Sequence, residues 1–296
     1  MNIQPLNIYQ NYQYRSPSFG DCAIRSANAA DNLIKHYTCL GRGFHLDLNK
    51  LSDYVIDLIK NDKNNCEFVF CGCSDGSEVF QILMALVTRM GKRGISLDNL
   101  PKFTAFDTDP YILDVARSGR INVSEKFIKS YPTAYPYIFF SEEGPLIKHP
   151  NDDIATLEKR LGSPITHSYQ FHKGLLKNIE FKTGDMLDEF RKLDDKNCKI
   201  LFCRNVAQYN EIPYQYDAAG ALNKNLKSGS LVIVGLGDER RDLVRRLEND
   251  KWKDYITLPF CQALDHNNGG KFGHESYISP PPKSVVYVKG EHFLKL

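Results

Sequence analysis

The residues whose types and spacing could support chemistry are concentrated in one short stretch of this 296-residue chain, Gly72-Cys-Ser-Asp-Gly-Ser-Glu78. Two glycines bracket a turn that also carries a hydroxyl at Ser74 and a carboxylate at Glu78. Glycines let the backbone approach a ligand closely, and an acid beside such a turn can bind a cationic group. The stretch therefore predicts a ligand-binding or catalytic turn.

The residues on either side of this turn indicate the elements that position it. Phe68, Val69 and Phe70 form a short apolar run typical of a strand. Beyond the turn, apolar residues recur at helical spacing between Ile82 and Val87, so the period changes from 2 to 3.6 across the glycines. A strand, a glycine turn and a helix in this order predict a turn at the carboxyl edge of an open α/β sheet, where such folds bind ligands.

Four interpretations of the turn remain open on these residues alone. Gly72-Cys-Ser-Asp-Gly76 fits the G-x-S-x-G elbow of serine hydrolases, with Ser74 as nucleophile. The turn could also bind a dinucleotide, although it lacks the full G-x-G-x-x-G pattern, or the amino-acid part of S-adenosylmethionine (SAM). The fourth interpretation is an ordinary glycine turn.

A second acid follows the next predicted strand. Residues 103–106 are apolar and β-prone and lead directly into Asp107. An acid at the end of the second strand faces the ribose in dinucleotide and SAM folds alike. Asp109 precedes Pro110, which predicts an N-cap and the first position of a helix.

The rest of the chain predicts an α/β domain over residues 63–296, preceded by a helical segment over residues 1–62. Helical spacing covers residues 16–37 and 47–59 in that first segment. The strand and helix rhythm breaks between about residues 121 and 178, which predicts an inserted subdomain. Further strands are expected at residues 166–171, 179–182, 199–206, 230–235, 255–258 and 284–288, with helices at 152–161, 214–226 and 238–249.

Composition excludes several classes of function. A formal net charge of +2 with 25% charged residues gives no reason to expect nucleic acid or an anionic membrane as partner. No stretch approaches the length of a membrane span, and the first ten residues do not resemble a signal peptide, so we expect a cytoplasmic protein without membrane insertion. The eight cysteines are expected to be reduced core thiols, and Cys71-x-Cys73 has no second pair that would predict a metal site.

Five motifs occur together in a family-specific order. They are Gly72 to Glu78, Ala105-Phe-Asp-Thr-Asp109, Ala116-Arg-Ser-Gly119, Phe181 to Leu187, and Phe202-Cys-Arg-Asn-Val206 with Tyr209. In this order they resemble the chemotaxis-receptor glutamate O-methyltransferases, the CheR type of SAM-dependent enzyme. The resemblance runs from about residue 36 to about residue 240. It implies a Rossmann-like SAM-dependent methyltransferase fold, with a central, mostly parallel sheet, an antiparallel closing strand and an inserted small subdomain.

The resemblance also implies roles for individual residues. Glu78 would bind the ammonium of SAM, Asp107 the ribose hydroxyls, and Asp185 with Met186 the adenine edge. The other cofactor-binding positions that it implies are Thr38, Arg42, Gly72, Ser74, Gly76, Arg204 and Asn205. No metal is implied, and the product of the cofactor would be S-adenosylhomocysteine (SAH).

At the reacting end the resemblance implies Arg42 and Tyr209 as catalytic residues and a carboxylate, in an acidic protein or a small acid, as methyl acceptor. The family's receptor-docking N-terminal domain is reduced here to some 35 residues, so chemoreceptor helices are expected to be poor substrates. The competing hypothesis is a non-catalytic SAM-, SAH- or peptide-binding module. A methyltransferase acting on a small molecule and the Ser74 hydrolase are the further alternatives, and the sequence makes no prediction of the number of subunits.

Overall fold

A computed structural model describes residues 48–61, 66–125, 140–144, 155, 158, 164–204, 206–207, 210–227, 229–234, 253–254 and 285–288. The predicted helices at 16–37 and 238–249, and the predicted strand at 255–258, lie outside these residues. Of the predicted helix at 152–161, only residues 155 and 158 are described. The predicted division into a segment at 1–62 and a domain at 63–296 stays a prediction.

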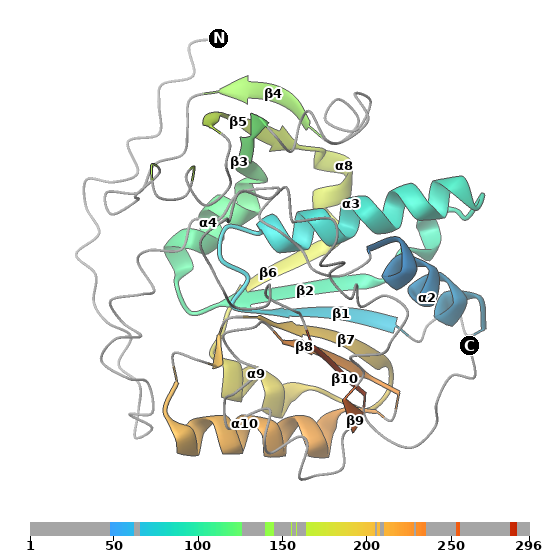
Figure 1. The fold of residues 1–296 in the computed structure, drawn as a ribbon, viewed down its shortest axis with the longest axis vertical. Helices are drawn as coiled ribbons and strands as arrows, with labels where there is room; N and C mark the ends of the chain where they lie inside the picture. The colour runs from blue at the N-terminus through green and yellow to red at the C-terminus, as the bar shows by residue number, and fades with distance from the viewer. Residues whose placement is uncertain are drawn as a thin grey trace, which may run out of the picture.

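A seven-stranded sheet forms the centre of the molecule, with the strand order β6-β2-β1-β7-β8-β10-β9 (Figure 1). Its strands are β1 (Cys66–Cys71), β2 (Lys102–Asp107), β6 (Ile179–Thr183), β7 (Cys198–Cys203), β8 (Leu231–Val234), β9 (Lys253–Asp254) and β10 (Val285–Val288). The five strands from β6 to β8 are parallel, and β10 pairs antiparallel with both β8 and β9. This confirms the predicted mostly parallel sheet with an antiparallel closing strand.

Helices cover both faces of the sheet, as parallel strands require for burial. One layer holds α2 (Leu48–Asn61) and α3 (Ser77–Lys92), and the opposite layer holds α9 (Met186–Lys192) and α10 (Ile212–Asn225). The remaining helical elements are η1 (Leu97–Asn99), α4 (Pro110–Ser118) and α8 (Lys173–Leu176). As predicted, the side chain of Asp109 caps α4, where it accepts the Tyr111 N–H at 2.9 Å.

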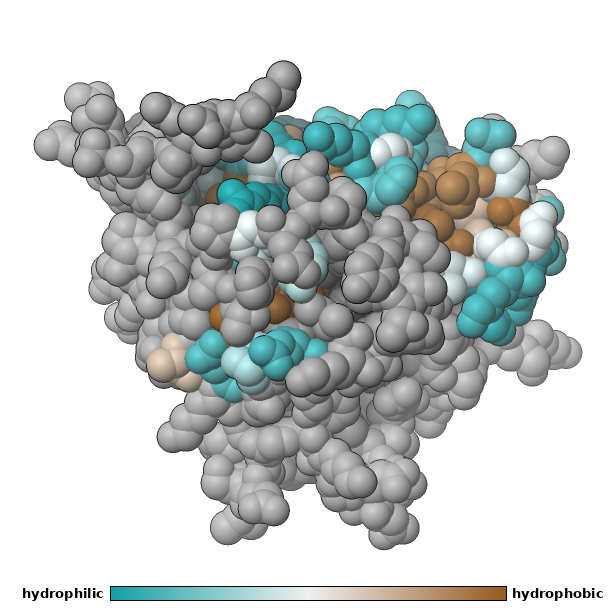
Figure 2. Space-filling view, turned by 90° about the horizontal axis from the view of Figure 1, so that it is seen from above, coloured by the Kyte–Doolittle hydropathy of each residue, from teal (hydrophilic) through white to brown (hydrophobic). Residues whose placement is uncertain are grey.

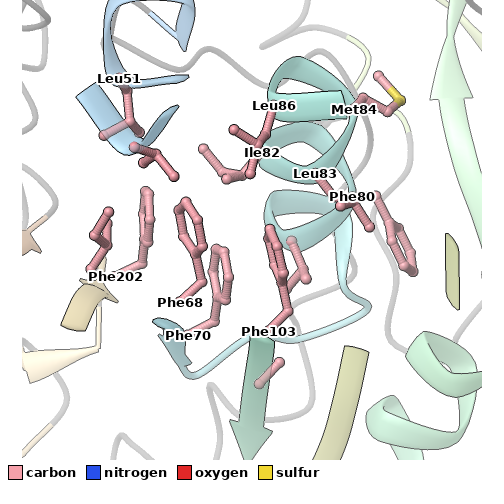
Figure 3. Close-up of a cluster of buried hydrophobic side chains, with 14 of the residues drawn as sticks. Leu51, Phe68, Phe70, Phe80, Ile82, Leu83, Met84, Leu86, Phe103 and Phe202 are labelled. Carbon is pink, nitrogen blue, oxygen red and sulfur yellow. The ribbon is translucent and has the colours of Figure 1, made fainter. Parts of the chain in front are cut away.

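Successive side chains of β1 point to opposite faces of the sheet, so the strand contributes to the core on both sides. Phe68 and Phe70 point toward α2 and α3, whereas Val69 and Cys71 point toward α9 and α10. Because β1 pairs in register with β2 and β7, the rings of Phe103 and Phe202 stack on either side, with Phe70 and Phe202 4.8 Å apart between centroids. Figure 3 shows this row of rings beneath α3.

A bidentate ion pair joins the two helices of the first layer. Arg89 of α3 donates to both carboxylate oxygens of Asp53 in α2, at 2.5 and 2.6 Å. The hydrogen bond from Arg89 holds the pKa of Asp53 below its ordinary value. The pair therefore fixes how α2 lies against α3 in addition to the apolar contacts between them.

A separate three-stranded antiparallel sheet interrupts the main domain between α4 and β6. It has the order β3-β5-β4, from β3 (Arg120–Ser124), β4 (Phe140–Gly144) and β5 (Ile165–Phe171). Phe171 at the end of β5 stacks on Phe80 of α3, with the ring centroids 4.6 Å apart. This contact attaches the small sheet to the helix that follows the Gly72 turn.

The surface seen from the side of the small sheet is largely hydrophilic where it belongs to described residues (Figure 2). A hydrophobic area lies at the right of that view, on the side where α3 ends in Figure 1. The large hydrophobic side chains that are exposed in the described part of the chain are Leu97, Ile212 and Tyr216.

We predict that the row of phenylalanines is the main source of stability for the central strands. Phe70 is fully buried between Phe103 and Phe202, so Phe70→Ala should lower the free energy of unfolding by about 3–5 kcal/mol. Urea denaturation followed by circular dichroism measures this change. Phe70→Leu, which refills most of the volume, should cost clearly less, and equal costs for the two variants would contradict the packing argument.

Candidate functional site

The turn after β1 has the backbone conformation that its glycines predict. Gly72 and Gly76 have φ values of +64° and +81°, and Ser74 between them has +52°. The Gly76 N–H donates to the Cys73 carbonyl at 3.0 Å, which closes the turn before α3 begins at Ser77. Glycine adopts a positive φ without the steric cost that Ser74 bears here, so the turn favours glycine at both positions.

Asp107, at the end of β2, connects three neighbouring loops. One carboxylate oxygen accepts the Ser74 N–H at 2.9 Å, and the other accepts the Asp109 N–H at 3.1 Å. Its backbone carbonyl accepts the Gly184 N–H at 2.9 Å, from the loop after β6. Asp107 as a residue is 9% exposed, and main-chain donors hold its carboxylate, so it is a fixed acceptor at the carboxyl edge of the sheet.

Glu78 and Arg204 form an ion pair at the same edge. Arg204 Nη1 lies 2.6 Å from Glu78 Oε1, and the two side chains are only 14% and 19% exposed. Glu78 lies in the first turn of α3, and Arg204 directly follows β7. Cys71 and Cys203 pair in register at the ends of β1 and β7, which brings the two residues together across 126 positions of sequence.

Asp185 caps α9, and its side chain accepts hydrogen bonds from Leu187 and Tyr214. The Leu187 N–H donates to Asp185 Oδ1 at 3.0 Å, as expected of an N-cap. The hydroxyl of Tyr214, in α10, donates to the same oxygen and in turn accepts the Leu187 N–H at 2.9 Å. Asp185, Leu187 and Tyr214 thus form a closed hydrogen-bonded triangle beside Met186.

Val206 packs directly onto the glycine turn. A Cβ atom added to Gly72 would lie 2.6 Å from Val206 Cγ2, closer than real Cβ atoms approach a neighbour. The chain after β7 therefore rests on the chain after β1. It leaves the sheet at Cys203, three residues earlier than predicted, because Arg204 turns to Glu78 and Val206 to Gly72.

The thiols beneath the site are unsuited to nucleophilic or metal chemistry. Burial raises the pKa of Cys71 and of Cys73 well above the ordinary value, so both are neutral thiols at neutral pH. Cys203 contacts Met186, with the two sulfurs 3.8 Å apart. Among the residues that the structure describes, no group of three or more His, Cys, Asp or Glu side chains could hold a metal ion.

Most of the predicted site residues are described, and they lie at the carboxyl edge of the parallel strands. These residues are Gly72, Ser74, Gly76, Glu78, Asp107, Asp185, Met186 and Arg204. The other four, Thr38, Arg42, Asn205 and Tyr209, lie outside the described residues. Sequence reasoning did not predict the pairing of Glu78 with Arg204, the contact of Val206 with Gly72, or any role for Tyr214.

Comparison with known protein families gives one match. Residues 149–256 match the family model described as CheR methyltransferase, SAM binding domain. Asp185, Met186, Arg204 and Tyr209 fall inside that range, whereas the Gly72 turn and Asp107 precede it. No curated protein matches the chain.

Solved structures with a similar arrangement share little sequence with this chain. A TehB-like SAM-dependent methyltransferase from Corynebacterium glutamicum is 10% identical over 81% of this chain and 87% of its own, with a TM-score of 0.39. Geranyl diphosphate C-methyltransferase from Streptomyces coelicolor A3(2), solved with Mg²⁺, geranyl diphosphate and SAH, is 11% identical over 81% of this chain and 78% of its own, with a TM-score of 0.36. The bifunctional kinase-methyltransferase WbdD is 12% identical over 88% of this chain but only 45% of its own, with a TM-score of 0.43. At these scores the similarities carry no argument about this chain.

The sheet topology and the family match define the class. The chain has the Rossmann-like fold of a SAM-dependent methyltransferase, and SAM is its cofactor. Residues 149–256 are similar to the SAM-binding domain of the CheR methyltransferases. The groups at the sheet edge fit this cofactor chemically. Glu78 and Arg204 are an anion and a cation in contact, and Asp107 is a separate carboxylate held by main-chain amides.

No helix in the described parts of the chain has both the length and the apolar character needed to cross a membrane.

Two glycines with nearly the same φ angle allow a test of the turn. Gly72 and Gly94 have φ values of +64° and +65°, but an added Cβ meets Val206 only at Gly72 and nothing within 4 Å at Gly94. Both alanine variants should lose about 1–2 kcal/mol from backbone strain. Only Gly72→Ala should also weaken SAH binding, by about 10-fold or more, because the clash moves the turn and the chain carrying Arg204.

Isothermal titration calorimetry with SAH and thermal unfolding of the same samples measure the two effects. Gly94 is a suitable control because it follows the far end of α3, which has 16 residues and is about 24 Å long. Equal SAH affinity for the two variants would contradict a functional role for the contact between Gly72 and Val206.

Proposed function

We propose that this protein transfers the methyl group of SAM to a carboxylate, in an acidic protein or a small acid. The observation that carries the cofactor part of the proposal is the contact between Glu78 and Arg204 beside the Gly72 turn, one strand away from the anchored carboxylate of Asp107. The order of the sequence motifs is typical of protein-glutamate O-methyltransferases, and this supports a carboxylate as the methyl acceptor.

The Glu78 and Arg204 pair suits the amino-acid end of the cofactor. SAM ends in an α-amino-acid zwitterion, which has one ammonium and one carboxylate group. Glu78 would bind the ammonium and Arg204 the carboxylate, so each charge of the pair would gain an opposite charge from the ligand. Because both side chains are largely buried, a ligand that carried only one of the two charges would leave the other uncompensated.

Asp107 suits the ribose hydroxyls. Hydroxyl groups donate hydrogen bonds, and an ionised carboxylate only accepts them. The Ser74 and Asp109 amides fix the orientation of this carboxylate, so little side-chain freedom is lost when a ligand binds. Asp185 and Met186, at the start of α9, would border the adenine ring.

The reaction requires positioning of the reactants rather than acid or base catalysis by the protein. When bound, SAM supplies a methyl group activated by the sulfonium. A carboxylate acceptor is already ionised at neutral pH, so the protein needs no general base and contributes mainly by positioning. The resemblance assigns this positioning to Arg42, which can hold a carboxylate through a planar pair of hydrogen bonds, and to the hydroxyl of Tyr209.

We predict that Glu78 recognises only the amino-acid end of the cofactor. Glu78→Gln removes the negative charge but keeps the size of the side chain, so SAH binding should weaken by about 10- to 100-fold. 5′-Methylthioadenosine contains the same nucleoside and sulfur but no amino acid, and its affinity should change by less than about 2-fold. Calorimetry with the two ligands measures both values.

Asp107→Ala is the matched control, because it should weaken both ligands through their common ribose. Unfolding temperatures of the two variants show whether each remains folded. If Glu78→Gln weakens 5′-methylthioadenosine as much as SAH, the assignment of Glu78 to the ammonium is wrong.

The chemical class of the acceptor gives a separate prediction. Incubation with methyl-labelled SAM and extracts of acidic proteins or small acids should give products whose label is released as methanol in mild alkali, because methyl esters hydrolyse readily. Tyr209→Phe should reduce turnover more than SAM affinity, since a contact at the reacting end mainly serves the transition state. Arg42→Lys should be nearly as harmful as Arg42→Ala.

Label that survives alkali would exclude the carboxylate and point to nitrogen or carbon as acceptor. SAM binding with no transfer to any extract would favour the non-catalytic module. Covalent labelling of Ser74 by a fluorophosphonate probe would instead favour the hydrolase. Its candidate downstream histidines, His266, His274 and His292, lie outside the described residues.

A further inference from the structure

Tyr214 makes a contact that the cap of α9 does not require. It lies near the start of α10, is 4% exposed, and its hydroxyl donates to Asp185 Oδ1 at the N-terminus of α9. An N-cap needs only a backbone donor, and the Leu187 N–H already donates to this oxygen at 3.0 Å. The tyrosine therefore adds a donor from another helix to a carboxylate that already accepts from its own helix.

The second donor restricts how the carboxylate can rotate. The terminal torsion of an aspartate side chain is broad, so a carboxylate with one hydrogen bond can still turn about it. Tyr214 contacts the carboxylate from a different helix, and the Leu187 N–H also donates to the tyrosine oxygen at 2.9 Å. The three groups therefore hold one another, and the orientation of Asp185 depends on how α9 packs against α10.

We propose that Tyr214 is a positioning residue that sets the selectivity of the site for adenine by fixing the carboxylate of Asp185. The inference rests on the proposed role of Asp185 at the adenine edge. Adenine presents an amino group, a hydrogen-bond donor, at the position where hypoxanthine presents a carbonyl oxygen. A fixed carboxylate accepts from the amino group and repels the carbonyl, whereas a carboxylate that can rotate away discriminates less.

The test compares the affinities of SAH and S-inosylhomocysteine, in which a carbonyl oxygen replaces the amino group of the purine and the neighbouring ring nitrogen N1 carries a hydrogen. The wild type should prefer SAH, and Tyr214→Phe should reduce the ratio of the two affinities by about 10-fold, the usual effect of one hydrogen bond to a charged group. Tyr216→Phe is the matched control, because it removes the same hydroxyl two residues later from an exposed side chain, and it should leave the ratio unchanged. A ratio of two affinities measured on one sample does not depend on how much of that sample is folded.

A double-mutant cycle tests whether Tyr214 acts through Asp185. In the Asp185→Asn background, Tyr214→Phe should no longer change the ratio, because the charged acceptor that it orients is gone. If Tyr214→Phe weakens both ligands equally, or changes the ratio equally in both backgrounds, the positioning role is wrong.

The design separates this inference from the proposed function. A wild type that does not bind SAH would contradict the cofactor site itself. In a different outcome, the wild type prefers SAH, Asp185→Asn loses this preference and Tyr214→Phe keeps it. That outcome would leave the adenine site intact and overturn only the role of Tyr214.

Discussion

The in-register pairing of β1 with β7 is the constraint on which the site depends. The two strands end together at Cys71 and Cys203, so the glycine turn and Arg204 leave the sheet side by side. The distance from Arg204 to Glu78 and the contact of Val206 with Gly72 both follow from this register. A shift of one residue would move every side chain of β7 to the other face and separate the ion pair.

Apolar side chains on both faces of the sheet hold that register. On one face the rings of Phe70 and Phe202 stack at 4.8 Å beneath α3, and on the other Val69 and Leu201 pack toward α9 and α10. A slip would therefore disrupt two cores at once.

Much of the fold could be predicted because each element leaves a local signal. The run from Phe68 to Phe70, the glycines at 72 and 76, and the cap at Asp109 all act on their immediate neighbours, and each lies where it was predicted. The same applies to the acid at the end of β2. The end of β7 was predicted three residues too late, since nothing local shows that Arg204 turns to a partner 126 positions away.

The contacts that join loops could not be predicted in the same way. Tyr214 and Asp185 are 29 positions apart, and their contact exists only because α9 and α10 pack on one face of the sheet. In the sequence, Tyr214 is equally consistent with a core position of an amphipathic helix that makes no hydrogen bond to Asp185. Thr38, Arg42, Asn205 and Tyr209, which the resemblance assigns to the cofactor and the reacting end, lie outside the described residues, and their roles remain predictions.

The central claim is that SAM binds along the carboxyl edge of β1, β2 and β7, with its amino acid between Glu78 and Arg204. A crystal structure of the protein grown with SAH tests it most directly. We expect electron density for the ligand at this edge, with the ammonium within hydrogen-bonding distance of Glu78, the carboxylate against Arg204 and the ribose at Asp107. SAH bound elsewhere, or bound with its amino acid away from an intact pair of Glu78 and Arg204, would contradict the account.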